Sequence, residues 1–405
     1  MDALVARFPA ATPWHALLGG LMLASAVHAC ALQLGSPLGI SGFLHSAVAQ
    51  LARRGRSSPL SQQQPADAAA ASLSERTARQ TASLFTAGIL TGGAVLGVVQ
   101  RPLQAALGVP LLDAAPAAPA SVALLALQGA LIGLGTRLGN GCTSGHFLSG
   151  LSRLSVRSLA ATATFFGVAV ATHLHLHGSA AAPAAAVLKH LSTRAPRPEL
   201  WAVLLLQAPA VVYWLIVPRM LAAAESAAAS RQTRTADERA QRHSHAARIS
   251  AFTIGLHFAF GLGLTGMLRP SKVLGFLSLS PQAFSQGTWD PSLAFVALGG
   301  ILPASFGFFT QVAPRMKHSQ PSIHLAVPKW RIPTRTDVMN VRLIGGATLF
   351  GLGWGATVRL CPGPVLVTTS AAVVPALLGG AHTQLRSLAV FLAALIAGGQ
   401  LGALI

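Results

Sequence analysis

Two short segments of the 405-residue chain carry the side chains best suited to chemistry. Residues 133–146 read GLGTRLGNGCTSGH, and residues 351–364 read GLGWGATVRLCPGP. Each segment ends an apolar run with Gly-Leu-Gly and then carries an arginine, a cysteine and residues that break a helix, so the two form a weak internal repeat. A thiol is polarizable and donates a weak S–H hydrogen bond. Because glycine lets the backbone approach a ligand closely, each segment is a candidate binding loop.

The ligand that these loops favour is an anion. A helix broken inside a membrane exposes N–H groups at its amino end, and these groups attract negative charge. Asn140, Thr143 and Ser144 add side-chain donors, and Arg137 and Arg359 would compensate charge. Apart from Glu199, the first residue of the span expected at 199–221, the expected membrane spans contain no Asp or Glu, which argues against a cation path or a carboxylate proton relay. With two thiols present, we expect an anion that contains sulfur. The predicted binding residues of the two loops are Asn140, Gly141, Cys142, Thr143, Ser144, Gly145, His146, Cys361, Pro362 and Gly363.

The composition requires a membrane around these loops. Only 10% of the residues are charged, against roughly a quarter in soluble domains. The hydrophobic fraction is 52% and the mean hydropathy is +0.57. So much apolar surface excludes a disordered chain, and three cysteines exclude a disulfide-stapled domain. The net charge of +19 lies in stretches between apolar segments without interleaved aromatic residues, which is typical of membrane loops and not of a nucleic-acid binder.

The apolar segments predict an all-α polytopic membrane protein. Segments near 20 residues suit a helix that crosses a hydrocarbon core about 30 Å thick. Two shorter segments, 38–52 and 364–379, are interpreted as re-entrant or half helices. About nine spans are expected, at residues 14–33, 82–100, 121–138, 156–178, 199–221, 248–267, 292–312, 340–358 and 384–405.

The internal repeat divides the chain into a first membrane half (1–224), a basic polar linker (225–247) and a second membrane half (248–405). Three polar segments rich in Arg or Lys, 53–80, 225–247 and 313–341, are expected on the cytoplasmic side. They share one side if 121–138 crosses the bilayer fully. If that segment is only half a crossing, the first two lie on opposite sides, and the sequence leaves both arrangements open.

Longer motifs resemble one known family, the YeeE/YedE sulphur-transport family. The similar segments are 40–42 (ISG), 140–146 (NGCTSGH), 150–158 (GLSRLSVRS), 266–276 (GMLRPSKVLGF), 289–295 (WDPSLAF), 353–355 (GWG) and 360–364 (LCPGP). The resemblance implies an inner-membrane or plasma-membrane protein, or an organelle membrane in a eukaryote, built from two inverted repeats. It also implies uptake of thiosulfate, passed between cysteine thiols at a central waist, with a soluble TusA-type sulfurtransferase as a partner.

By this resemblance, Cys142 and Cys361 match the two central cysteines of the family, and Cys30 corresponds to a third at the mouth of the path. Two other functions remain open. A membrane sulfurtransferase would form a persulfide on Cys142 or Cys361, with His146 as the one base nearby in sequence. A scaffold would use its glycines only to pack helices. No cofactor is expected, and no metal site, because the chain has no Cys-x-x-Cys pair.

Overall fold

The structure, a computed structural model, has helices and no strands in the part of the chain that it describes. It describes every residue except 55–65, 114–120, 178–195, 231–235, 325–329, 334–338, 357–360 and 378–381. Within the described residues, seven helices are long and apolar enough to cross a bilayer. The prediction of an all-α polytopic membrane protein is confirmed.

Along the chain, the helices form a first half, a connection and a second half. The first half forms α1 (Asp2–Arg7), α2 (Pro13–Leu34), α3 (Ile40–Arg54), α4 (Ala66–Val98), α5 (Gln100–Leu107), α6 (Val122–Leu138), the π-helix η1 (Ser144–Gly150), the 3-10 turn η2 (Leu151–Arg153) and α7 (Val156–His177). The connection forms α9 (Leu200–Leu206), α10 (Ala208–Val211), η3 (Val212–Ile216) and α11 (Val217–Ser230). The second half forms α12 (Ala236–Leu264), α13 (Pro270–Leu277), α14 (Pro281–Gln286), α15 (Ser292–Gly307), η4 (Phe308–Val312), α16 (Ala313–Lys317), α17 (Val341–Ala356), α18 (Pro362–Leu377) and α19 (His382–Leu401).

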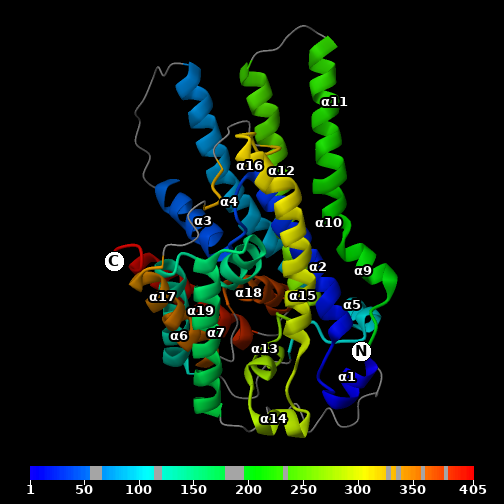
Figure 1. Ribbon diagram of the computed structural model, residues 1–405, viewed down its shortest axis with the longest axis vertical. Helices are drawn as coiled ribbons and strands as arrows, with labels where there is room; N and C mark the ends of the chain where they lie inside the picture. Colours follow the sequence, from blue (N-terminus) through cyan, green and yellow to red (C-terminus); the bar gives the residue numbers. More distant parts are fainter. Residues whose placement is uncertain are drawn as a thin grey trace.

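The long helices form two bundles, and each bundle takes helices from both halves (Figure 1). In one bundle α4 packs on α12, α2 on α15, and α2 on α12. In the other, α6 packs on α19, α7 on α17, and α6 on α17. If α2 corresponds to α12, α4 to α15, α6 to α17 and α7 to α19, exchanging the two halves interconverts four of these pairings and leaves α2 with α12 and α6 with α17 unchanged. The shorter segments η1 and α18 contact helices of both bundles and so lie between them.

Close backbone approaches show that the two halves are inverted. Along α6 and α17 the contacts run in opposite directions, since Gly135 meets Phe350 while Gly353 meets Ile132. The corresponding helix of the other half therefore points the opposite way. Small residues allow these approaches, which is how membrane helices gain packing contacts without a hydrophobic driving force. The inverted arrangement expected from the family resemblance is present in the helix directions.

The spans expected at 121–138 and 340–358 form two short helices, α6 and α17. α6 has 17 residues and α17 has 16, about 26 and 24 Å at 1.5 Å per residue. Both lengths are less than the roughly 30 Å of a hydrocarbon core. α6 stops because Asn140 adopts a left-handed backbone (φ 55°). The short segments expected at 38–52 and 364–379 form α3, of 15 residues, and α18, of 16 residues.

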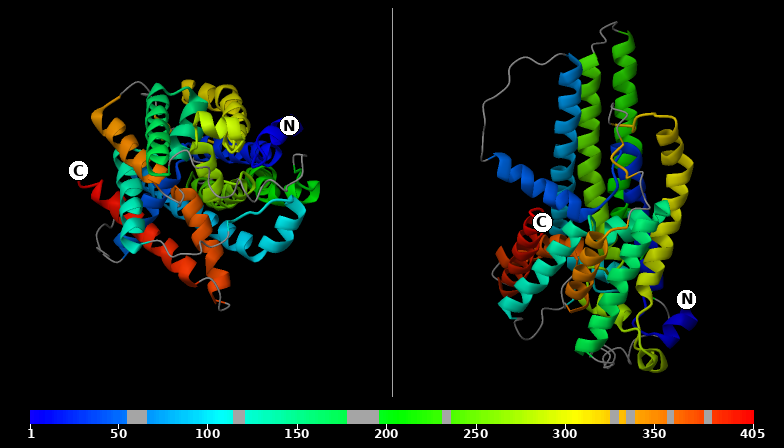
Figure 2. Two further views of the ribbon diagram at one scale, coloured as in Figure 1. Left: turned by 90° about the horizontal axis from the view of Figure 1, so that it is seen from below. Right: turned by 60° about the vertical axis from the view of Figure 1, so that its left-hand side comes forward.

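One end of the molecule gathers the basic segments. Figures 1 and 2 place the start of α4, the end of α11, the start of α12 and α16 at the same end. These elements belong to the three Arg- and Lys-rich segments 53–80, 225–247 and 313–341, so the described parts that they form lie at one end of the molecule. The expectation that this end is cytoplasmic, from the positive-inside rule, stays a prediction. The long helix α4, with 33 residues or about 50 Å, extends beyond a hydrocarbon core here.

The polar linker 225–247 is largely helical, because α11 runs to Ser230 and α12 begins at Ala236. Glu225 of α11 lies 3.0 Å from His243 and 3.6 Å from Arg239, both of α12, so charge pairs hold the two helices together. Exposed pairs of this kind contribute little stability each. The division of the chain into halves at this linker stays a prediction.

The glycine contacts between the halves generate a prediction about stability. A methyl group added at Gly133 of α6 would lie 2.0 Å from the carbonyl oxygen of Leu395 in α19. Because that neighbour is backbone and cannot swing away, we expect Gly133→Ala to force α6 and α19 apart at a cost of about 1–3 kcal/mol. The measurement is the thermal unfolding midpoint of the purified protein in detergent.

Gly167→Ala in α7 is the matched control, because an added methyl group there meets nothing within 4 Å. The control should keep or slightly raise the midpoint, since alanine favours a helix over glycine. Equal midpoints for Gly133→Ala and the wild type would contradict the inferred close packing between the halves.

Candidate functional site

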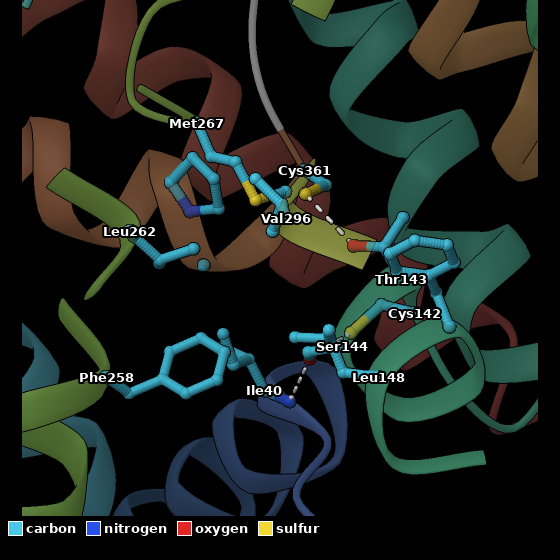
Figure 3. Close-up of a pocket in the computed structure, with 13 residues that line it drawn as sticks. Ile40, Cys142, Thr143, Ser144, Leu148, Phe258, Leu262, Met267, Val296 and Cys361 are labelled. Atoms are coloured by element: carbon cyan, nitrogen blue, oxygen red, sulfur yellow. Dashed lines mark hydrogen bonds between the residues drawn. The ribbon is translucent and has the colours of Figure 1, made fainter. Parts of the chain in front are cut away.

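A cavity lies where the two bundles meet, and both predicted cysteine loops open onto it (Figure 3). Its walls come from η1 and the residues before it, from the start of α18, from α12 and the turn after it, and from α3 and α15. The lining residues are Ile40, Cys142, Thr143, Ser144, Phe147, Leu148, Phe258, Leu262, Met267, Val296, Cys361, Gly363 and Pro364. The inverted halves thus bring together two cysteines that are 219 positions apart in the sequence.

His146 holds the Cys142 loop in shape without facing the cavity. Its Nε2 lies 3.1 Å from the carbonyl oxygen of Gly139, and its Nδ1 lies 3.2 Å from Ser158 Oγ. A carbonyl only accepts, so Nε2 carries the proton and Nδ1 accepts from the Ser158 hydroxyl. A methyl group at Gly141 would lie 2.7 Å from His146 Nε2, so glycine at this position lets the loop pass over the ring.

The thiol of Cys142 is paired with a hydroxyl of its own loop. Cys142 Sγ lies 3.2 Å from Ser144 Oγ. The same oxygen accepts from the backbone N–H of Ile40, at 3.1 Å, and so satisfies a free donor at the start of α3. Because Ser144 already accepts from Ile40, its own proton is available for the thiol or for a ligand.

The thiol of Cys361 is paired with a hydroxyl from the opposite half. Cys361 Sγ lies 3.3 Å from Thr143 Oγ1, and both residues are buried. Cys361 immediately precedes α18, whose amino end faces the cavity and carries a partial positive charge of roughly half a unit. Pro362 and Pro364 have no N–H, so the backbone donor among the first three residues of α18 is that of Gly363.

The remaining wall of the cavity is apolar. Phe258, Leu262 and Val296 face the hydroxyl side, and no charged side chain is among the described residues that line it. Two described arginines bind the Cys142 loop and η1 without lining the cavity. Arg157 donates to the carbonyl oxygen of Gly139 at 3.3 Å, and Arg153 donates to the carbonyl oxygen of Ser149 at 2.7 Å. Both arginines therefore place positive charge next to this part of the chain, and neither places it inside the cavity.

The predicted site residues separate into two groups. Cys142, Thr143, Ser144, Cys361 and Gly363 line the cavity. The others do not: Asn140 is exposed, Gly141 and His146 shape the loop, Gly145 lies within η1, Pro362 starts α18, and Cys30 is buried in α2. Arg359 lies outside the described residues. Across the described ranges, no three His, Cys, Asp or Glu side chains cluster in a way that could hold a metal ion.

Sequence reasoning missed the apolar half of the lining. Phe258 and Leu262 are four residues apart on α12, a spacing that puts them on one face of the helix, but an apolar helix gives no sign of which face lines a cavity. Met267 lies in a motif that was noted only for its resemblance to a family. The available sequence signal was Gly266 followed by Pro270, which indicates a break after the apolar run, and in the structure Gly266 has a φ of 76°.

Comparison with known proteins identifies relatives of both halves. Residues 4–171 match the family described as "Sulphur transport", and residues 247–401 match a family of unknown function, DUF6691. A "Probable transporter" of Xylella fastidiosa strain 9a5c is 37% identical over 129 residues, which are 32% of this chain and 78% of that protein. A "Probable transporter" of strain Temecula1 is 36% identical over 149 residues, 36% of this chain and 82% of that protein.

No solved structure matches the chain at a significant level. The family assignment therefore stands on the match of residues 4–171, which contain the Cys142 loop, and on the curated relatives. The Cys361 loop lies in the residues that match the family of unknown function. These matches agree with the motifs at 140–146 and 150–158. The chain is an integral membrane protein and belongs to the sulphur transport family, the YeeE/YedE family.

Proposed function

We propose that the protein carries thiosulfate, or a closely related sulfur-containing anion, across the bilayer by passing it between the thiols of Cys142 and Cys361. One observation carries the proposal. Two thiols from inverted halves line one small cavity between the bundles, and each thiol is hydrogen-bonded to a hydroxyl that a ligand is able to replace.

The donors around the cavity suit a soft anion. Thiosulfate has a terminal sulfur, which accepts from an S–H group, and three oxygens, which accept from hydroxyl and backbone N–H groups. Thr143 and Ser144 supply the hydroxyls, and the amino end of α18 supplies a positive dipole. No carboxylate lines the described cavity to repel negative charge.

In the proposed step the anion exchanges hydrogen bonds and forms no covalent bond. Without ligand, Cys142 bonds to Ser144, and Cys361 bonds to Thr143 across the interface of the halves. The terminal sulfur of the anion displaces the hydroxyl from one thiol and then from the other. Each displaced hydroxyl is then free to donate to an oxygen of the anion. The thiols stay protonated, because a neutral S–H is the donor that the step uses.

The cavity offers little support for the sulfurtransferase alternative. Nucleophilic attack by Cys142 would need a base to take the thiol proton. His146 is the base nearest in sequence, but both of its ring nitrogens are engaged, with Gly139 and Ser158, and the thiol of Cys142 is paired with Ser144. The names of the Xylella relatives also favour transport.

A soluble TusA-type sulfurtransferase is the proposed partner. It would meet the anion, or sulfur derived from it, at the end of the molecule that gathers the basic segments. α4 and the α11–α12 pair extend from the membrane bundle there and offer a helical surface to a soluble protein (Figure 2).

Removing either central thiol should stop transport. We expect Cys142→Ala and Cys361→Ala each to reduce thiosulfate flux into proteoliposomes to the level of protein-free vesicles, because one of the two S–H donors is lost. Cys30→Ala is the matched control, since the Cys30 side chain is buried in α2 and does not line the cavity. Flux at the wild-type rate in the double variant Cys142→Ala/Cys361→Ala would rule out the thiol relay, and loss of flux in Cys30→Ala would extend the relay to a third thiol.

A second measurement separates transport from enzymatic transfer. After incubation with thiosulfate, the purified protein should show flux in vesicles and an unmodified mass for both cysteine peptides. A stoichiometric persulfide on Cys142 or Cys361 that an added thiol acceptor removes with turnover would favour the sulfurtransferase instead.

A further inference from the structure

The cavity contains a third sulfur atom, which belongs to neither cysteine loop. Met267 lines the cavity, and Figure 3 shows its thioether beside Val296 and close to Cys361, across from the hydroxyl side. Met267 follows α12 at the start of the short connection to α13. The second half therefore contributes two sulfur atoms to this wall, a thiol and a thioether.

The turn that presents Met267 is fixed by its own backbone. Gly266 has a φ of 76°, which glycine adopts without strain, and its carbonyl oxygen accepts from the N–H of Arg269 at 3.0 Å. The Thr265 hydroxyl accepts from the N–H of Met267 at 3.3 Å. These bonds set the direction in which the thioether leaves the chain.

Two ion pairs anchor the residues that follow the turn. Arg269 donates to Asp113 at 2.8 Å, and the buried Lys272 lies 3.1 Å from Asp290. Lys272 also donates to Thr12 at 2.8 Å, which ties the turn to the start of α2. These contacts fix the backbone around Met267, so the thioether enters the cavity from a defined position.

The two sides of the cavity differ in what they offer an anion. Thr143 and Ser144 present hydroxyl donors on one side. The opposite side has Met267 with apolar neighbours, and a thioether has no hydrogen to donate. An oxygen of an anion placed there would be buried without a partner, which is costly. A terminal sulfur is large, polarizable and weakly hydrated, so it loses little there and gains dispersion contact with the thioether.

We propose that Met267 is a specificity-determining residue, whose thioether receives the terminal sulfur of the anion and thereby excludes oxyanions such as sulfate. This inference rests on the proposed function. Thiosulfate fits in one orientation, with its three oxygens toward Thr143 and Ser144 and its sulfur toward Met267 and Cys361. Sulfate has four equivalent oxygens, so one of them always faces the Met267 thioether, which has no hydrogen to donate.

The test measures thiosulfate flux into proteoliposomes with sulfate as a competitor. Met267→Leu keeps the volume and removes the polarizable sulfur, and it should weaken the apparent affinity for thiosulfate by roughly two- to tenfold. Met267→Gln has a similar length and adds an N–H donor to this side. It should make sulfate compete about tenfold more strongly, because the fourth oxygen then finds a partner.

Met22→Leu is the matched control, because Met22 is fully buried in α2 and does not line the cavity. This variant should leave unchanged both the apparent affinity for thiosulfate and the inhibition constant of sulfate. An unaltered ratio of sulfate to thiosulfate constants in both Met267 variants would overturn the inference, as would an equal change in Met22→Leu. Absence of thiosulfate flux in the wild type would instead count against the proposed function itself.

Discussion

The hydrocarbon core of a bilayer offers no hydrogen bonds, and the site depends on this constraint. A helix that ends inside the core exposes N–H and C=O groups that only the protein or a ligand is able to satisfy. The structure meets the need locally: Ser144 accepts from the start of α3, and His146 donates to the carbonyl at the end of α6. The same small polar groups that close the broken backbone also stand beside the thiols. The hydrogen-bond donors beside the cavity are thus among the groups that satisfy the helix ends in a region without water.

The inverted arrangement explains why the two helix breaks lie together at one site and not at two separate sites. Each half supplies one helix that stops short, α6 or α17, and one polar segment after it, η1 or α18. Because the halves point in opposite directions, the two breaks meet between the bundles, where each bundle contains helices of both halves. The bond between Thr143 and Cys361 spans this meeting point.

Much of this arrangement was predictable from the sequence. Apolar length and low charge predict membrane helices because the bilayer imposes a fixed thickness, and Gly-Asn-Gly before Cys142 and Pro-Gly-Pro after Cys361 predict broken helices because of backbone geometry. The side of the membrane on which 53–80 and 225–247 lie could not be predicted, because it depends on whether 121–138 crosses fully. The contributions of Met267 and Phe258 could not be predicted either, since apolar side chains in an apolar span carry no periodic signal. Asn140 stays a prediction as a binding residue; it is exposed, has a left-handed backbone and is not among the residues that line the cavity.

The two prolines at the start of α18 have a consequence for turnover. An ordinary helix amino end would offer several N–H groups to an anion and hold it tightly. Pro362 and Pro364 have no N–H, so the helix dipole attracts an anion but few hydrogen bonds hold the anion in place. Conduction requires binding that is strong enough to admit an ion and weak enough to let it leave. For the anion passage proposed above, the missing donors would favour a short residence time over high affinity, which a passage needs and a storage site does not.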